Sequence, residues 1–442
     1  MSKATARQFE ARESLPEVAL LEHYFDRLWP LPRSITGEGV RRTHDILGEL
    51  LPLERIEIPT GTQVFDWTVP REWVVRGAHI IAPDGRRLLD FADNNLHLVG
   101  YSQPFRGKLS RAELDTHLHS LPDRPTAIPY VTSYYAPSWG FCLSHEQRQA
   151  LPQGEYDVVV DTALIDGSMT LSECVLPGET GREVLISVNT CHPSLASNEL
   201  SGPLVAAFLY RRLAALPRRR LTYRFAFVPE TIGAIAYLSL RGEKLRERLV
   251  AGYVLTCLGD AGRFTYKRSR RSGSPGDRAA AQVLTQCGRR ADIIDFFPQG
   301  SDERQYCSPG FDLPVGCLTR TMYWRYPEYH TSLDNKDFIS FSAMVETIDT
   351  CFDICKVLDA EGRYRNLVPF GEPQLGKRGL YPSFGGSNEK EARVRAQAWL
   401  LNLSDGNHSL LDIAERSGET VLQLAEIAET CVAAGLLERM PS

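Results

Sequence analysis

The sequence predicts an α/β protein with a three-layer αβα core, and three observations lead to that class. Between about residues 180 and 350, continuous apolar runs typical of buried strands alternate with amphipathic helical segments. Strands joined by helical crossovers form a mostly parallel sheet with helices on both faces. Short β-rich runs precede this stretch, and three short helical segments follow a Gly- and Pro-rich linker at 361–390. The core is therefore expected to carry a small β-rich domain and a C-terminal helical domain.

Within the core, strands and helices alternate along the chain. Residues 183–191 are typical of a fully buried strand, and an amphipathic helix is expected over 200–216. The pattern then repeats, and a long helix closes the core. The further expected strands are 222–230 and 251–260, and the further helices are 235–249, 279–289 and 341–360. Polar residues stand at or just after the three strand ends, where ligand sites of such sheets lie.

The first 165 residues change from helical to β-rich patterning. Helices are expected over 19–31 and 40–51, and short alternating runs fill about 52–165. One helix over 109–121 interrupts these runs, and Ser110 with Glu113 forms a capping box at its start. We place the boundaries at 1–55 for the N-terminal helical part of the core, 56–165 for the β-rich inserted domain, 166–375 for the αβα core and 376–442 for the C-terminal domain.

The C-terminal segments are typical of a winged helix, a relative of the helix-turn-helix. Their basic content is low, so contact with a protein is favoured over nucleic-acid binding. Either this domain or the β-rich domain would supply the surface for a protein partner or for a homo-oligomer.

Composition and charge exclude several classes of protein. The chain of 442 residues has 50 Lys and Arg against 55 Asp and Glu, a net charge of −5, so bulk attraction to nucleic acid or membranes is not expected. No apolar run approaches the roughly 20 residues of a membrane span, and the N-terminus lacks a signal-peptide pattern, so a cytoplasmic protein is expected. The ten cysteines form no C-x-x-C pair and suit reduced core residues.

Two histidines and several carboxylates stand where the strands are expected to end. His192 directly follows the first strand, and His330 lies in a polar segment after the sheet. The carboxylates at strand or loop ends are Glu199, Glu230, Asp260, Asp302 and Glu303. A hydrolytic zinc needs three such ligands, an open position and a further carboxylate that handles the proton of water. Glu230 suits that last role, although an acid at a helix N-terminus is also its ordinary use.

Nine segments carry a resemblance to a known family. They are LPRSITGEGVR, VFDWTVPREW, IPYVTSYY, WGFCLSH, CHPSLASNELSGP, PETIGAIAYLS, GSDERQYCSPG, YPEYHTSLD and EPQLGKRGLYP. The chain resembles aminopeptidase-like proteins within the clan of zinc aminopeptidases and glutaminyl cyclases over about residues 25–440. The resemblance implies a phosphorylase/hydrolase-like αβα core, an inserted β-rich domain, a C-terminal winged helix and a role around polysaccharide or natural-product biosynthesis.

The resemblance also implies roles for individual residues. The first and last zinc histidines of the clan correspond to His192 and His330, and its catalytic base corresponds to Glu230. Three other ligand positions are changed, to Asn198, Thr231 and Thr256. We therefore expect one zinc ion, held by His192, Glu199 and His330, with Asp260 as a fourth group or as a partner of a ligand.

The segment GSDERQY is expected to form a loop, and the resemblance implies that this loop lines the substrate pocket. Asp302 and Glu303 would hold a substrate ammonium group, and Arg304 would bind a carboxylate. Tyr306 would donate a hydrogen bond to an oxyanion, and Arg270 would reach the same pocket. The alternative is a surface loop held by ion pairs.

Three functions remain open at this point. The leading hypothesis is a zinc-dependent aminopeptidase or amide hydrolase acting on a small peptide or aminoacyl conjugate. The second is an aminoacyl cyclase or transferase of the same clan, in which an amine replaces water as nucleophile. The third is a non-catalytic scaffold with a degenerate metal site, whose winged helix docks a partner. The changes at Asn198 and Thr231 keep this third hypothesis open.

Overall fold

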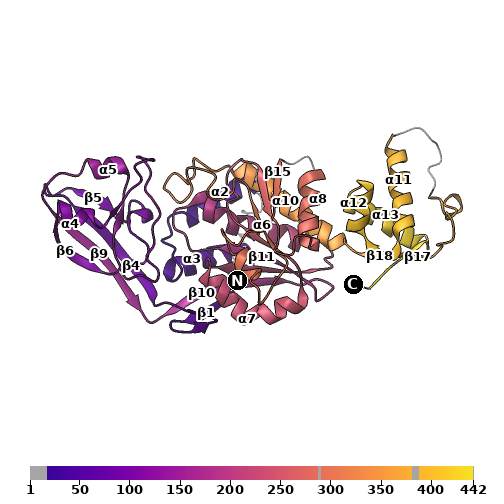
Figure 1. Ribbon diagram of the computed structural model, residues 1–442, viewed down its shortest axis with the longest axis horizontal. Helices are drawn as coiled ribbons and strands as arrows, with labels where there is room; N and C mark the ends of the chain where they lie inside the picture. Colours follow the sequence, from indigo (N-terminus) through magenta and orange to yellow (C-terminus); the bar gives the residue numbers. More distant parts are fainter. Residues whose placement is uncertain (1–16, 287–289, 381–387, 442) are drawn as a thin grey trace, which may run out of the picture.

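A computed structural model describes residues 17–286, 290–380 and 388–441. The molecule is elongated, with three parts in a row along its long axis (Figure 1). The β-rich part, drawn in indigo and purple, lies at one end, the αβα core in the middle, and the C-terminal helices at the other end. The predicted fold class is confirmed.

One eight-stranded sheet forms the middle layer of the core. Its strand order is β1-β10-β12-β11-β13-β16-β14-β15. The four strands from β12 to β16 in this order are parallel to one another, and β10 and β14 join them antiparallel. The bounds are β1 (Glu54–Pro59), β10 (Ser168–Leu176), β11 (Glu183–Asn189), β12 (Thr222–Val228), β13 (Leu249–Leu255), β14 (Phe264–Lys267), β15 (Ala291–Ile294) and β16 (Val315–Thr319).

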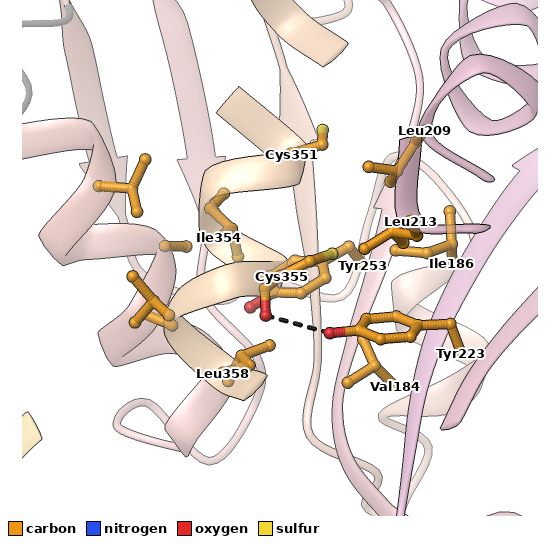
Figure 2. Close-up of a cluster of buried hydrophobic side chains, with 14 of the residues drawn as sticks. Val184, Ile186, Leu209, Leu213, Tyr223, Tyr253, Cys351, Ile354, Cys355 and Leu358 are labelled. Atoms are coloured by element: carbon orange, nitrogen blue, oxygen red, sulfur yellow. Dashed lines mark hydrogen bonds between the residues drawn. The ribbon is translucent and has the colours of Figure 1, made fainter. Parts of the chain in front are cut away.

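Helices cover both faces of this sheet. One face carries α2 (Glu17–Leu28), α6 (Ser201–Ala214), α8 (Pro275–Gln286) and α10 (Phe341–Ala360), with α3 (Glu38–Leu47) beside α2 and α6; the other carries α7 (Ile232–Arg248) and α9 (Glu303–Tyr306). Figure 2 shows the first interface, where Val184 and Ile186 of β11 meet side chains of α6 and α10. Tyr223 donates a hydrogen bond of 3.1 Å to the carbonyl of Cys355 there, so a buried hydroxyl is satisfied.

The inserted part is built on a four-stranded antiparallel sheet of order β5-β4-β9-β6. Its strands are β4 (Glu72–Ile81), β5 (Arg87–Asp90), β6 (Phe105–Ser110) and β9 (Glu155–Ile165), and a small ribbon joins β2 (Gln63–Val64) to β3 (Trp67–Thr68). The capping box of Ser110 and Glu113 is present. The helix it starts is only α4 (Arg111–Asp115), because β7 (Leu118–His119) follows and pairs with β8 (Phe141–Cys142). The expectation of a helix to residue 121 is therefore wrong.

The structure pairs two strands with parts of the chain other than those in which the expected boundaries place them. Residues 56–59 belong to β1 and pair with β10 in the main sheet. The strand β17 (Arg363–Asn366) pairs with β18 (Asp405–Ser409) and β19 (Leu437–Arg439), so the C-terminal unit begins well before residue 376. The β-type run at 55–59 was expected, but its partner β10 is distant in sequence, so its place in the main sheet does not follow from local pattern.

The C-terminal unit has the three expected helices, α11 (Asn388–Leu403), α12 (Leu410–Ser417) and α13 (Val421–Ala433). It packs on the core: α13 contacts α10, and Arg278 of α8 pairs with Asp412 and Glu415. The nine cysteines within the described part of the chain are buried free thiols, as expected for core residues. In this part of the chain, no helix is long and apolar enough to cross a membrane.

Candidate metal centre and active-site cavity

The candidate site lies at the carboxyl ends of two neighbouring parallel strands. β11 ends at Asn189, three residues before His192, and β12 ends at Val228, two residues before Glu230. The two strands pair in parallel, so both side chains are delivered to the same edge of the sheet. The sequence-predicted histidine and carboxylate therefore meet, and His192 Nε2 lies 3.6 Å from Glu230 Oε2.

Glu199 fixes the orientation of the His192 ring. It lies on the turn of π-helix Ala196–Leu200 that leads into α6. Its Oε2 is 2.8 Å from His192 Nδ1, and its Oε1 accepts hydrogen bonds from the backbone N–H groups of Cys191 and His192. Donor atoms of Cys191, His192 and Glu199 lie within 4.8 Å of one another, a spacing that could hold a metal ion. The three side chains are buried, so this is a closed cluster behind the ring.

His330 brings a second imidazole to the open side of His192. The two ring centroids are 5.3 Å apart, and the ring of Tyr130 lies 4.9 Å from His192 and 5.2 Å from His330. Desolvation by burial and the neighbouring His192 lower the pKa of His330 to about 3. His330 is consequently a neutral imidazole near pH 7, the form that binds metal ions.

The loop that carries His330 is held by the inserted part. The Tyr130 N–H donates to the His330 carbonyl at 2.9 Å, and Ile128 and Ser332 exchange hydrogen bonds. His330 itself has a φ of 54°, in the left-handed region that costs a non-Gly residue free energy. The insertion thus builds part of the site rather than standing apart from it.

Glu230 is one of the residues that line a cavity, and its side chain is 26% exposed. Burial raises the pKa of Glu230 above its ordinary value, against the lowering effect of His192 and Arg304. The next residue, Thr231, has a φ of 65° and is fixed from both ends. Its N–H donates to Asp302 Oδ1 at 2.7 Å, and its hydroxyl accepts from Arg304 at 2.7 Å.

The cavity has a volume of about 380 Å³ and two chemically different walls. The core supplies the polar wall, and the inserted part supplies an aromatic wall. The lining residues are Ile35, Trp67, Tyr130, Thr132, Tyr134, Tyr135, Cys191, His192, Glu230, Thr231, Ile232 and His330. Sequence reasoning had not assigned the aromatic residues to the site, although the IPYVTSYY segment that holds three of them stood out among the family-like motifs.

The predicted pocket loop at 302–306 is instead the short helix α9, and most of it is turned away from the cavity. Glu303 forms a fully buried ion pair with Lys267. Tyr306 is fully buried, and its hydroxyl lies 2.9 Å from the Ser187 hydroxyl. Asp302 and Arg304 reach the site only through Thr231. The expectation of a loop is wrong, because these side chains find partners inside the core.

The two remaining candidates also lie off the cavity. Asp260 is buried, and its carboxylate accepts hydrogen bonds from the Gly262 N–H at 2.6 Å and the Thr321 hydroxyl at 2.7 Å. Arg270 is half-exposed and pairs with Asp312 at 3.1 Å. The structure therefore brings together His192, Glu199, Glu230 and His330, and leaves these two outside the group.

The fold and this strand-end site define an aminopeptidase-like protein. The zinc aminopeptidase of Bacillus subtilis superposes with a TM-score of 0.55 at 13% identity, covering 76% of this chain and 93% of that one. An M28 peptidase precursor of Shewanella amazonensis gives 0.55 at 11% identity, covering 81% and 96%. At such identities the likeness shows the fold alone.

The chain belongs to the family described as domain of unknown function DUF4910, whose profile matches residues 22–361, and residues 362–439 match a winged helix-turn-helix. A Clostridium acetobutylicum protein, named as a polysaccharide biosynthesis protein with an aminopeptidase-like domain, is 41% identical over 93% of this chain and 94% of its own. A crystal structure from that species, named as a peptidase, has a TM-score of 0.89 at 38% identity, covering 99% of both chains. These comparisons confirm the resemblance to aminopeptidase-like proteins that the motifs indicated. They also confirm the predicted C-terminal winged helix.

Proposed function

We propose that this protein is a zinc-dependent hydrolase that cleaves an amide bond in a small peptide or aminoacyl conjugate. One observation carries the proposal: His192 Nε2, Glu230 Oε2 and the His330 ring face one another on the wall of a cavity at the strand ends. The names of the relatives, a zinc aminopeptidase and a polysaccharide biosynthesis protein, support a conjugate that belongs to a biosynthetic pathway.

The donor set fits zinc on the open side of His192. Imidazole nitrogens and carboxylate oxygens are ligands that zinc accepts. We assign the ion to His192 Nε2 and His330, because a catalytic ion needs an open position toward the substrate and the Nδ1 side is closed. Asn198 Oδ1, on the same turn as Glu199, is a buried acceptor that finds no hydrogen-bond partner among the described residues. When bound, zinc would polarise the scissile carbonyl and the attacking water.

Glu199 then has the position of a carboxylate that orients a metal-binding imidazole. Its 2.8 Å contact with Nδ1 sets the tautomer of His192, so that Nε2 offers its lone pair to the cavity. This role replaces the ligand role that we expected from the sequence. A Glu199→Gln variant separates the two, since loss of an orienting partner weakens metal affinity by about 10–100-fold, whereas loss of a ligand removes binding.

Glu230 is assigned the proton transfers. It stands beside His192 and on the cavity, so it can take a proton from the attacking water and pass it to the leaving amine. Its raised pKa suits a group that must hold the proton between those two events.

The test is turnover of a panel of aminoacyl amides and short peptides by the zinc-loaded protein. Glu230→Gln is expected to keep its zinc and to lose about 10²–10⁴-fold in kcat. Glu361→Gln is the matched control, because burial also raises the pKa of Glu361. Glu361 lies at the junction with the winged helix, where it accepts a hydrogen bond from the Leu411 N–H, and it is not among the residues that line the cavity. Unchanged turnover in Glu230→Gln would reject the assigned role. A wild-type chain that binds no zinc and cleaves nothing would favour the scaffold function.

A further inference from the structure

The aromatic wall of the cavity comes from the inserted part, and its residues Trp67, Tyr134 and Tyr135 have no role in the proposed cleavage. Trp67 lies on the short ribbon strand β3, and Tyr134 and Tyr135 follow Tyr130 along the chain. Trp67 and Tyr135 pack edge to face with ring centroids 5.5 Å apart. They keep 36% and 53% of their surface exposed, respectively, so large apolar faces remain open at the cavity.

The ribbon that carries Trp67 is held against the core. Phe65, at its tip, packs edge to face on Phe311 with centroids 5.7 Å apart, and β2 contacts α7. Trp67 is therefore placed beside the cavity by a fixed contact, and its exposure is not that of a free loop tip. Rigid aromatic rings held in this way bind ligands at a low cost in conformational entropy.

The charges of the cavity restrict what these rings can bind. Among the described residues that line it, Glu230 carries the negative charge and there is no Lys or Arg. The nearby Arg304 is engaged by the Thr231 hydroxyl and the Gly300 carbonyl. At the aromatic wall, away from the zinc of the proposed function, a phosphate or carboxylate would lose its hydration without meeting a Lys or Arg, which disfavours anionic groups there. The volume, about 380 Å³, lies within the range of roughly 300–1,000 Å³ of pockets for small organic molecules.

We propose that Trp67, Tyr134 and Tyr135 form a docking platform for an uncharged six-membered ring of the substrate, next to the amide bond that is cleaved. The inference rests on the proposed function for the position of that bond. The flat apolar face of the ring stacks on the aromatic faces, while the hydroxyls of Thr132 and the tyrosines receive its polar edge. A pyranose and an aromatic ring share this chemistry, and the two are separated by experiment.

Binding is measured first, because it does not depend on turnover. Saturation-transfer NMR is recorded with methyl β-glucopyranoside, benzyl alcohol and the open-chain 1-hexanol on the wild-type protein, W67A and W399A. Trp399 is the matched control, since it is also 36% exposed but lies on α11 of the winged helix. We expect ring protons of at least one cyclic probe to receive saturation in the wild type and in W399A, and the affinity to fall at least tenfold in W67A.

The cyclic probe that binds the wild type more tightly shows whether the substrate ring is a pyranose or an aromatic ring. Equal binding to the wild type and W67A, or hexanol binding as well as both rings, would overturn the platform. Such a result would leave the proposed hydrolysis untouched, whereas an inactive protein that still binds rings through Trp67 would reject only the proposed function.

Kinetics supply the second arm once a substrate is turned over. The ratio of kcat/KM for a ring-bearing alanine amide to that for plain alanine amide is expected to fall at least tenfold in W67A. It should stay within twofold of the wild-type ratio in W399A. An unchanged ratio in W67A would also overturn the platform.

Discussion

Buried charged side chains lie at both ends of strands β11 and β12, and they are fully paired at the amino ends but incompletely paired at the carboxyl ends. At the amino ends, Arg224 of β12 donates to Glu183 of β11 at 2.6 Å and to Glu173 of β10 at 2.7 Å. Tyr237 and Arg241 of α7 add hydrogen bonds to Glu173. Burial acts to raise the pKa of Glu173, but these hydrogen bonds and the charge of Arg224 outweigh it and leave the pKa below its ordinary value.

At the carboxyl ends the charges are incompletely paired. Asp302 Oδ2 finds no hydrogen-bond partner in the described part of the chain, and burial together with the charge of Glu230 holds the pKa of Asp302 well above its ordinary value. Burial also raises the pKa of Glu230 above its ordinary value. Thr231, between them in space, has a backbone conformation that is unfavourable for its residue type.

The difference separates structural from functional charge on one sheet. A paired cluster at one end stabilises the fold, whereas the unfavourable one at the other end persists only because the surrounding core holds it. Perturbed carboxylates in a cavity are typical of functional sites. The following predictions break each cluster in turn, beginning with the larger effect.

Removing the central cation of the paired cluster should cost the most stability. Arg224→Met leaves Glu173 and Glu183 buried without their main partner, and we expect a loss of about 3–5 kcal/mol in the free energy of unfolding. Denaturant titration measures it. Lys244→Met is the control, because Lys244 lies 3.8 Å from Glu183 but its side chain is 44% exposed, and a loss of at most about 1 kcal/mol is expected. If Arg224→Met were as stable as the control, the cluster would not be structural.

Removing the charge of the unpaired cluster should change how stability depends on pH. An unfolded Asp titrates near pH 4, whereas native Asp302 keeps its proton to higher pH, so the native state binds more protons in between. The contribution of Asp302 to wild-type stability therefore falls as pH rises from about 4, by at most about 1.4 kcal/mol per pH unit. Asp302→Asn lacks this contribution, so its stability relative to the wild type should increase as pH rises. Unfolding midpoints of both proteins, measured from pH 4 to 8, test this.

Asp277 provides the opposite case as a control. Burial acts to raise the pKa of Asp277, but hydrogen bonds from Ser269, Gly273 and Ser274 leave it lowered. Its contribution is fully present above the unfolded pKa, near 4, and is lost as pH falls below it. Relative to the wild type, Asp277→Asn should therefore lose stability as pH rises toward about 4 and then change little up to pH 8. The same trend in both variants would contradict the distinction between the two clusters.

Features of the fold and site that depend on local sequence pattern could be predicted from the sequence. Continuous apolar runs give the parallel strands, and polar residues after their ends give His192 and Glu230, because the rule that sites lie at strand carboxyl ends needs no long-range information. Tyr130 was missed because its place depends on pairing with the His330 segment 200 residues away. Glu303 and Tyr306 were assigned to the pocket because their partners, Lys267 and Ser187, are distant in sequence and reveal themselves only after folding.

The most direct test of the account is the zinc content of the purified chain, prepared without chelator and measured by elemental analysis. We predict one zinc per wild-type chain, and none in His192→Ala or His330→Ala. His97→Ala is the control and should keep its zinc, since His97 is also buried but binds the Cys142 carbonyl at 2.8 Å in the inserted part. A wild-type chain without zinc, or equal zinc in His192→Ala, would contradict a metal-dependent site at the strand ends.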